Sequence, residues 1–308
     1  MGNGNDMGDE RLKATVNALA NGESLHQMCH LCHPSEPLLQ QAAIEEIITL
    51  SRALLFPGFF GGRDISDTSL EYAIGIQCER LKSVLEVQVH AGLIIGARQK
   101  GEQYNTGELA GRASQITADF IDALPGLRDT LRTDVSAIYL GDPAATSSEE
   151  VIYCYPALKA ITNYRIAHQL FTSGVPIIPR MISESAHSET GIDIHPGATI
   201  GGHFAIDHGT GVVIGATAIV GNNVKLYQGV TLGARSFDLD ENNNPIKGIP
   251  RHPIIGDNVV VYSNASILGR VTIGDNAVIG GNLWVTFDVA PGEKLVQAKA
   301  DNILRFKS

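Results

Sequence analysis

The chain has 308 residues, of which 44% are hydrophobic and 18% are charged, so it can bury a sizeable core and form two domains. Its formal net charge of -10 and its pI near 5.4 argue against a nucleic-acid partner, because a polyanion requires clustered Lys and Arg. The composition therefore indicates an acidic globular protein.

The first ten residues are polar and acidic and match neither a secretory signal nor a transit peptide. Asp6 stands where a myristoylation signal needs Ser or Thr. No apolar run reaches the roughly 18 residues that a membrane-spanning helix needs. We therefore expect a cytoplasmic protein without a membrane partner.

A Cys-x-x-Cys-His motif occupies residues 29–33 and matches both a haem-attachment site and half of a zinc site. Haem attachment needs export, which the N-terminus does not support, and zinc needs further ligands. We expect a local structural role and no metal, with zinc as the alternative. Four cysteines are too few for a disulfide framework, and Cys78 and Cys154 are predicted to be core thiols.

Helical apolar spacing dominates the chain from Leu38 to about residue 170. Two stripes lie on either side of a Pro-Gly and Gly-Gly break at 57–62, and a third runs from Ile116 to Ile138, with a restart after Pro125. The Gly-Asp-Pro sequence at 141–143 should end that helix, and Ser147 with Glu150 forms a capping box for the next. These signals predict a helical bundle.

A six-residue repeat begins after Gly191, where Gly, Asp, Asn and Val replace helix formers. The predicted register has no slip in the first run and is offset by one in the second. The first run is Ile194, Ile200, Ile206, Val212, Ala218, Val224 and Val230, and the second is Ile255, Val261, Ile267, Ile273, Ile279 and Val285. Between them, residues 235–253 are rich in Asn, Asp and Pro and are predicted to form a protruding loop.

Each unit of such a repeat supplies one short strand and one corner, and three units close a triangular coil. These coils resemble those of the hexapeptide-repeat family, whose coils are left-handed and whose members typically form trimers. The predicted fold is α+β. An α-helical domain over residues 1–190 is followed by a left-handed parallel β-helix over 191–308 with a short C-terminal tail.

Several polar motifs interrupt the repeat and occur in a fixed order. Asp-Ile-His-Pro starts at Asp193, Asp-His-Gly-Thr-Gly at Asp207, Tyr-Gln-Gly-Val-Thr-Leu-Gly at Tyr227 and Arg-His-Pro at Arg251, after a Gly-Asp-Pro-Ala turn at 141–144. With Tyr-Arg-Ile-Ala-His at 164–168, this set resembles the serine acetyltransferase family. The resemblance implies transfer of an acetyl group from acetyl-CoA to L-serine, the first step of cysteine biosynthesis.

Acetyl transfer to a hydroxyl requires a base, because an alcohol is too weakly acidic to attack a thioester unaided at pH 7. By resemblance, His208 is the general base and Asp193 orients its imidazole. The two residues are 15 positions apart, which is close to one predicted coil of 18. This spacing is compatible with neighbouring positions at one corner of the prism.

The resemblance also implies binding residues. Asp142 and Asp207 are expected to face the ammonium group of serine, and Arg251 and His252 its carboxylate. Gly233, Ala234, Ser263 and Gly281 match positions that line the acetyl-CoA groove, where small residues let the pantetheine arm approach the backbone. Acetyl-CoA is expected as a co-substrate, and no metal is expected.

Three other interpretations remain open. His203 and His208 show the spacing of two metal ligands in γ-class carbonic anhydrases, but the third ligand has no counterpart on the prism. A related acetyltransferase could act on another hydroxyl acceptor, such as homoserine or a sugar. An inactive hexapeptide scaffold would keep the apolar repeat without a complete polar set.

The resemblance further implies a homotrimer or a dimer of trimers, and inhibition by cysteine. Members of the family often end in an isoleucine that inserts into cysteine synthase. This chain ends in Arg305-Phe306-Lys307-Ser308, so a tail-mediated complex with cysteine synthase is expected to be weak or absent.

Overall fold

The computed structural model describes residues 6–21, 36–61, 69–236, 239–244 and 246–298. The Cys29 to His33 motif and the C-terminal tail therefore lie outside the described residues. Residues 1–38 and 39–308 form two separate units. The first contains helix α1, Asp6–Leu19.

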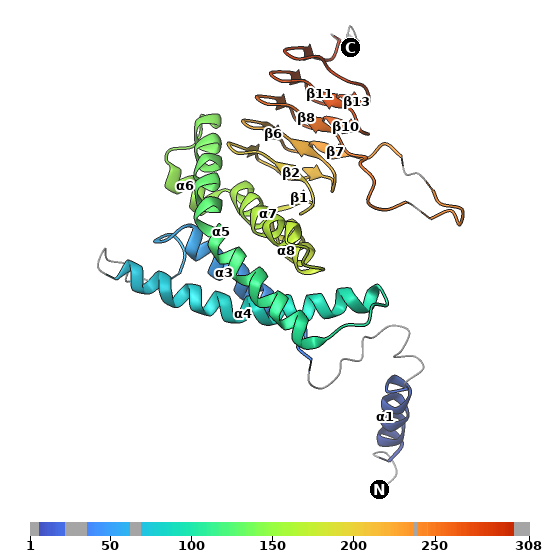
Figure 1. Cartoon of the computed structure of the whole chain (residues 1–308). Helices are drawn as coiled ribbons and strands as arrows, with labels where there is room; N and C mark the ends of the chain where they lie inside the picture. The colour runs from blue at the N-terminus through green and yellow to red at the C-terminus, as the bar shows by residue number, and fades with distance from the viewer. Residues whose placement is uncertain (1–5, 22–35, 62–68, 237–238, 245, 299–308) are drawn as a thin grey trace. The chain divides into compact units, whose positions relative to one another are not determined.

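Among its described residues, the second unit begins with six helices, shown in blue to yellow-green in Figure 1. They are α3 (Gln41–Leu55), α4 (Leu70–Gln99), α5 (Thr106–Gly141), α6 (Ser148–Cys154), α7 (Pro156–Thr172) and α8 (Ile178–Thr190). Ile44, Ile47, Leu81, Leu85 and Phe120 are fully buried between α3, α4 and α5. Among the described residues, no helix is both long enough and apolar enough to cross a membrane.

The helix ends follow their sequence signals, with two differences inside the helical region. α5 ends at Gly141, as predicted, and the Ser147 hydroxyl caps α6 by accepting from Glu150 N–H at 3.2 Å. The predicted restart after Pro125 is wrong, because α5 continues through this exposed proline. Cys154 is exposed rather than a core thiol, because α6 ends there at the surface, whereas Cys78 packs against the core.

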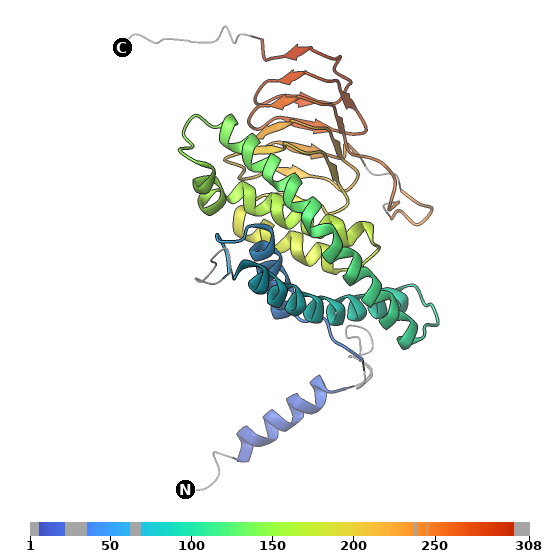
Figure 2. The ribbon, with the colours of Figure 1, turned by 60° about the vertical axis from the view of Figure 1, so that its left-hand side comes forward.

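The remaining chain forms a stack of about five coils, with three parallel sheets as the faces of a prism (Figures 1 and 2). This parallel solenoid is consistent with the predicted left-handed β-helix of hexapeptide repeats. One face is formed by β1 (Asp193–Ile194), β4 (Val213–Ile214), β7 (Thr231–Gly233), β10 (Ser266–Leu268) and β13 (Trp284–Val285). A second is formed by β2 (Thr199–Ile200), β5 (Ile219–Val220), β8 (Ile254–Ile255) and β11 (Thr272–Ile273). The third is formed by β3 (Ala205–Asp207), β6 (Lys225–Tyr227), β9 (Val260–Val261), β12 (Val278–Ile279) and β14 (Lys294–Leu295).

The chain turns three corners in each coil, and these corners carry the polar motifs. We call the corner after β3, β6, β9 and β12 the first corner, the corner after β1, β4, β7 and β10 the second, and the corner after β2, β5, β8 and β11 the third. The polar loop leaves the prism at the second corner, after β7, and the chain re-enters at β8 (Figure 1).

The expected unbroken register is wrong at the first corner. Asp193 pairs with Val213, twenty residues later, whereas Val213 pairs with Thr231, eighteen residues later. Two extra residues are therefore inserted around His208. Each repeat has two inward apolar positions that are two residues apart, such as Val212 and Ile214, so the insertion still leaves an apolar residue at every sixth position.

A buried ion pair joins the helices to the first coil of the prism. Both nitrogens on one edge of the Arg165 guanidinium donate to Asp134 of α5, at 2.6 and 2.9 Å. The same guanidinium donates to the carbonyls of Ile200 and Gly201, while Asp134 also accepts from Phe204 N–H at 2.9 Å. Asp134 is fully buried, so these contacts replace the water that its charge loses.

Replacement of Asp134 by Ala should lower the free energy of unfolding by about 3–5 kcal/mol, because it leaves Arg165 buried without a counter-ion. Urea unfolding followed by circular dichroism measures this change. Glu46→Ala is the matched control, because the Arg80–Glu46 pair has both side chains in water and its loss should change stability little. Equal effects of the two substitutions would contradict the role given to the buried pair.

Candidate active site

The first corner presents Asp207 and His208 at the end of β3. His208 has a positive φ of 58°, and Gly209 and Gly211 follow with φ of 96° and 80°, so the inserted residues form a left-handed bulge. The imidazole is exposed, and its Nε2 lies 3.7 Å from Oδ1 of Asp207. The bulge therefore holds a histidine outside the prism wall beside a carboxylate.

Asp142 reaches the same corner from the end of α5. Its carboxylate accepts a hydrogen bond from the Tyr155 hydroxyl at 2.6 Å and another from Ala144 N–H at 2.8 Å. These two donors lower the pKa of Asp142, and the same bond to Asp142 raises the pKa of Tyr155 to about 12. Asp142, Tyr155 and Asp207 line one small crevice, so the structure brings the two predicted ammonium-binding carboxylates together.

Lys225 also lines this crevice, and the sequence did not single it out. Its ammonium lies 2.9 Å from Oδ2 of Asp207 and donates to the carbonyl of Gly141 at 2.6 Å. It also lies 4.5 Å from the centre of the Tyr227 ring. Although burial acts in the opposite direction, these partners raise the pKa of Lys225. Lys225 thus fixes the end of α5 against β3, and the crevice keeps a net negative charge.

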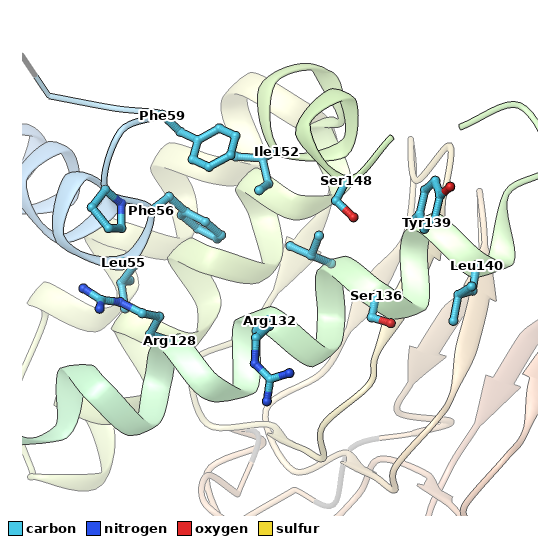
Figure 3. Close-up of a pocket in the computed structure, with 12 residues that line it drawn as sticks. Leu55, Phe56, Phe59, Arg128, Arg132, Ser136, Tyr139, Leu140, Ser148 and Ile152 are labelled. Carbon is cyan, nitrogen blue, oxygen red and sulfur yellow. The ribbon is translucent and has the colours of Figure 1, made fainter. Parts of the chain in front are cut away.

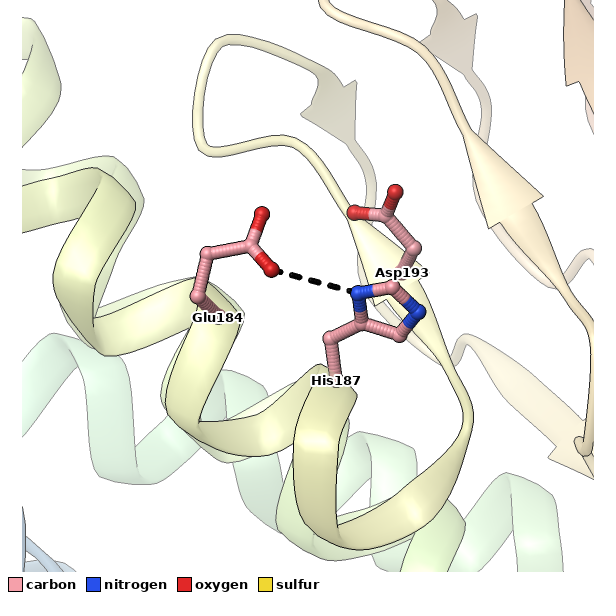
Figure 4. A group of neighbouring side chains, drawn as sticks. All are labelled: Glu184, His187 and Asp193. Atoms are coloured by element: carbon pink, nitrogen blue, oxygen red, sulfur yellow. Dashed lines mark hydrogen bonds and ion pairs between the residues drawn. The ribbon is translucent and has the colours of Figure 1, made fainter.

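Asp193 does not meet His208 in the described chain. Its carboxylate lies with Glu184 and His187 of α8 in a group whose ligand-type atoms are within 4.8 Å of one another (Figure 4). His187 Nδ1 is 3.2 Å from Glu184 Oε2. The inserted residues nevertheless contact the chain just before β1, because Gly211 N–H donates to the carbonyl of Gly191 at 2.8 Å and a Cβ on Gly209 would overlap the Ile192 side chain. The inserted residues therefore lie above the start of β1.

Arg251 and His252 lie at the second corner, where Thr217 fixes the imidazole. The Nδ1 atom of His252 accepts from Thr217 N–H at 3.1 Å and lies 2.8 Å from its hydroxyl. That hydroxyl oxygen accepts from the N–H groups of both Arg251 and His252, so its own proton is directed to Nδ1. The ring proton is consequently on Nε2, and the ring packs on Gly215, where a Cβ would overlap it.

Burial is the main cause that lowers the pKa of His252 to about 4, and the cations Arg251 and Arg270 and the neighbouring His195 add to the shift. His195 lies at the same corner, and burial lowers its pKa as well. His252 is therefore neutral at pH 7 and can donate one hydrogen bond from Nε2.

The predicted acetyl-CoA residues divide between two corners. Ser263 and Gly281 lie on successive coils at the first corner, where a Cβ on Gly281 would come within 3.0 Å of the Ser263 carbonyl. Gly233 and Ala234 lie at the second corner, where the polar loop begins. Within one chain, the predicted residues thus form two groups, one at each corner.

The geometry does not support the metal-binding alternative. His203 lies at the third corner and binds Asn223 through Nδ1 at 2.8 Å, whereas His208 lies at the first corner. A single ion cannot use both histidines of one chain. The Glu184–His187–Asp193 group is partly exposed, and within it His187 already contacts Glu184.

A separate cavity of about 550 Å³ lies between the end of α3, α5 and α6 (Figure 3). Apolar side chains such as Phe56 and Ile152 form much of its wall, with Arg128 and Arg132 on α5. None of the predicted site residues lines it. The motifs therefore locate the candidate site at the prism corners and not at this cavity.

The coils and their corner motifs define a hexapeptide-repeat transferase. In agreement, the family model described as bacterial transferase hexapeptide (six repeats) matches residues 252–286. A serine acetyltransferase of Synechococcus elongatus, designated "plasmid", is 45% identical over 269 residues, which cover 86% of this chain and 84% of that protein. The chain belongs to the serine acetyltransferase family, an acyltransferase family.

Solved structures give the same assignment. The crystal structure of Entamoeba histolytica serine acetyltransferase 1 in complex with L-cysteine has a TM-score of 0.70 and 38% identity, covering 81% of this chain and 86% of that chain. Neisseria gonorrhoeae serine acetyltransferase in complex with serine has a TM-score of 0.52 and 26% identity, covering 84% and 97%. The similarity to the first relative covers 86% of this chain, and so extends well beyond the motifs between Gly141 and Pro253.

The low pKa of His252 predicts a pH-dependent stability. Between pH 6.5 and pH 4 the unfolded imidazole binds a proton that the folded one does not, so the protein loses stability as the pH falls through this range. The free energy of unfolding falls by about 1.4 kcal/mol per pH unit, so the loss of stability attributable to His252 reaches about 3 kcal/mol. Urea unfolding at several pH values should show a shallower slope for His252→Gln than for the wild type.

Thr217→Ser is the matched control, because it keeps both the N–H and the hydroxyl that bond to Nδ1, so its slope should equal that of the wild type. A His252→Gln protein with an unchanged slope would show that this imidazole is not held neutral.

Proposed function

We propose that the chain transfers the acetyl group of acetyl-CoA to the hydroxyl of L-serine, forming O-acetyl-L-serine and CoA in the first step of cysteine biosynthesis. The observation that carries this proposal is the crevice in which Asp142 and Asp207 lie beside the exposed His208. Two carboxylates held around a single lysine suit a substrate ammonium, and the imidazole next to them suits a hydroxyl whose oxygen is three bonds from the ammonium nitrogen.

In the proposed reaction, His208 takes the proton of the serine hydroxyl as its oxygen attacks the thioester carbonyl. A carbon–oxygen bond forms, and the tetrahedral intermediate then collapses with cleavage of the carbon–sulfur bond. The proton held by His208 passes to the departing sulfur, so the imidazole returns to its starting state. Asp193 is proposed to orient the imidazole from the adjacent coil, after its side chain turns from His187.

We propose that Arg251 and His252 bind the serine carboxylate. The guanidinium offers a bidentate contact, and the neutral His252 offers its Nε2–H, which the Thr217 contact leaves available. Gly233, Ala234, Ser263 and Gly281 are proposed to line the acetyl-CoA groove. L-cysteine, which shares the ammonium and carboxylate groups of serine, would occupy the same contacts and inhibit.

His208, Asp207 and Asp142 lie at the first corner, whereas Arg251 and His252 lie at the second corner. Because the two groups are at different corners of one prism, one chain alone does not form the complete proposed site. We propose a homotrimer, alone or as a dimer of trimers, in which the first corner of one protomer faces the second corner of its neighbour. The exposure of His208 supports this arrangement, since an acid–base residue normally functions in a site that excludes water.

His208→Asn should lower kcat by roughly 10²–10⁴ with little change in the KM for serine, because it removes the base and not the ammonium contacts. Asparagine tolerates the positive φ at this position. CoA release measured with L-serine, L-homoserine and a sugar acceptor tests both the residue and the acceptor. His203→Asn, at the third corner with a similar φ of 57°, is the matched control and should keep wild-type activity.

Greater turnover of homoserine or a sugar than of serine would defeat the proposed acceptor, and full activity of His208→Asn would defeat the proposed base.

A mixture of two inactive variants tests the shared site. Co-expressed His208→Asn and Arg251→Gln chains should recover about one quarter of wild-type activity, because each site draws one half from each of two randomly assorted protomers. Each variant expressed alone is the control. If the mixture stays as inactive as the single variants, the two corners do not combine between chains.

A further inference from the structure

A second polar cavity, which the proposed reaction does not use, lies where the end of α3 meets α7 and the end of α8. It has a volume of about 380 Å³, within the range of small-molecule sites. Arg52 of α3, Lys159 of α7 and Glu189 of α8 line it, together with the rings of Phe60 and Tyr153. The cavity thus combines two cations and one carboxylate with an aromatic wall.

The positive charges in this cavity are not balanced. Lys159 forms an ion pair with Glu189, and within the described part of the chain Arg52 has no ion pair. The Nε atom of Arg52 is buried and has no hydrogen-bond partner, although its guanidinium lies 4.3 Å from the centre of the Phe60 ring. A buried N–H of a charged group without an acceptor is costly, and a ligand oxygen would satisfy it.

Two further observations point to an anion. Burial lowers the pKa of Arg52, and burial together with the nearby charge of Arg52 lowers the pKa of Lys159. The two cations therefore repel each other in a partly desolvated space, and a bound anion would relieve both effects. A guanidinium and an ammonium side by side suit a tetrahedral oxyanion, with the guanidinium as a fork and the ammonium as a point charge.

We propose that this cavity binds a small oxyanion, a sulfate or phosphate group, between Arg52 and Lys159. The group can be a free inorganic ion or part of an organic molecule. The volume of about 380 Å³ leaves room for an organic body beside the rings of Phe60 and Tyr153, which pack edge to face.

The site is also connected to the active-site crevice. Tyr155 lines the cavity, and its hydroxyl donates to Asp142, so one residue borders both sites. We extend the proposal to a regulatory effect: the bound oxyanion alters serine binding through Tyr155. This second step rests on the proposed role of Asp142, whereas the binding step does not.

Binding is tested by thermal unfolding of the full chain in sodium sulfate, sodium phosphate and phenyl phosphate, with sodium chloride at matched ionic strength as the reference. The melting temperature should rise saturably with at least one oxyanion in the wild type. Arg52→Gln should weaken this binding by about tenfold or more, because it removes a charge-assisted hydrogen-bond donor. Tighter binding of phenyl phosphate than of the inorganic ions would identify an organic ligand as the source.

Glu189→Gln is a variant in which the affinity for the oxyanion should change in the opposite direction. It removes the carboxylate that occupies Lys159, so the oxyanion should bind several-fold more tightly than to the wild type. Equal melting curves in oxyanion and chloride for the wild type, or equal affinities in all three proteins, would overturn the site.

The regulatory step has its own readout. The saturating oxyanion should change the KM for serine in the wild type, should leave the KM for acetyl-CoA unchanged, and should have no effect in Arg52→Gln. An unchanged KM for serine despite binding would overturn the coupling. Failure of the proposed acetyl transfer would be seen separately, as absent turnover without any added anion.

Discussion

The buried Asp134–Arg165 pair is the contact on which the arrangement of the candidate site depends. Asp134 lies on α5, which ends immediately before Asp142, and it accepts a hydrogen bond from the backbone N–H of Phe204, three residues before Asp207. Because both carboxylates of the crevice are attached through rigid elements to this one contact, their separation is set at a buried point. The two carboxylates themselves are held nearer the surface, Asp207 by Lys225 and Asp142 by Tyr155 and the N–H of Ala144.

The prism could be predicted from its sequence because a six-residue period has few other physical explanations. The protruding loop was also predictable, since its Asn, Asp and Pro residues offer nothing to bury. The slip at His208 was not, because Val212 and Ile214 both point inward and either can satisfy a sixfold pattern. The helix break predicted at Pro125 was wrong for a related reason. Local sequence preferences indicate a break at a proline, but packing of the surrounding residues keeps α5 helical.

The site was predictable in its motifs but not in its assembly. The family resemblance alone predicted that Asp142 and Asp207 lie together; their spacing in the sequence did not, since they are brought together by tertiary packing between the end of α5 and β3. Lys225 and Tyr155 belong to none of the motifs. A lysine that faces outward from a strand is usually interpreted as a solvated residue, so Lys225 was not predicted to be part of the site. The separation of His208 from His252 likewise depends on which face of the prism each strand joins. Only the strand pairing in the structure determines this.

The two additional residues at the first corner have a wider consequence for how such a protein can change. They project from the stack without interrupting it, since β3 and β4 still pair with the coils above in regular order. The proposed base, His208, therefore lies in an insertion, whereas the apolar layers of the prism beneath it supply the stability of the fold. Substitutions in this insertion can alter reactivity without changing the packing of the apolar core. The fold can therefore accommodate new chemistry there with little loss of stability.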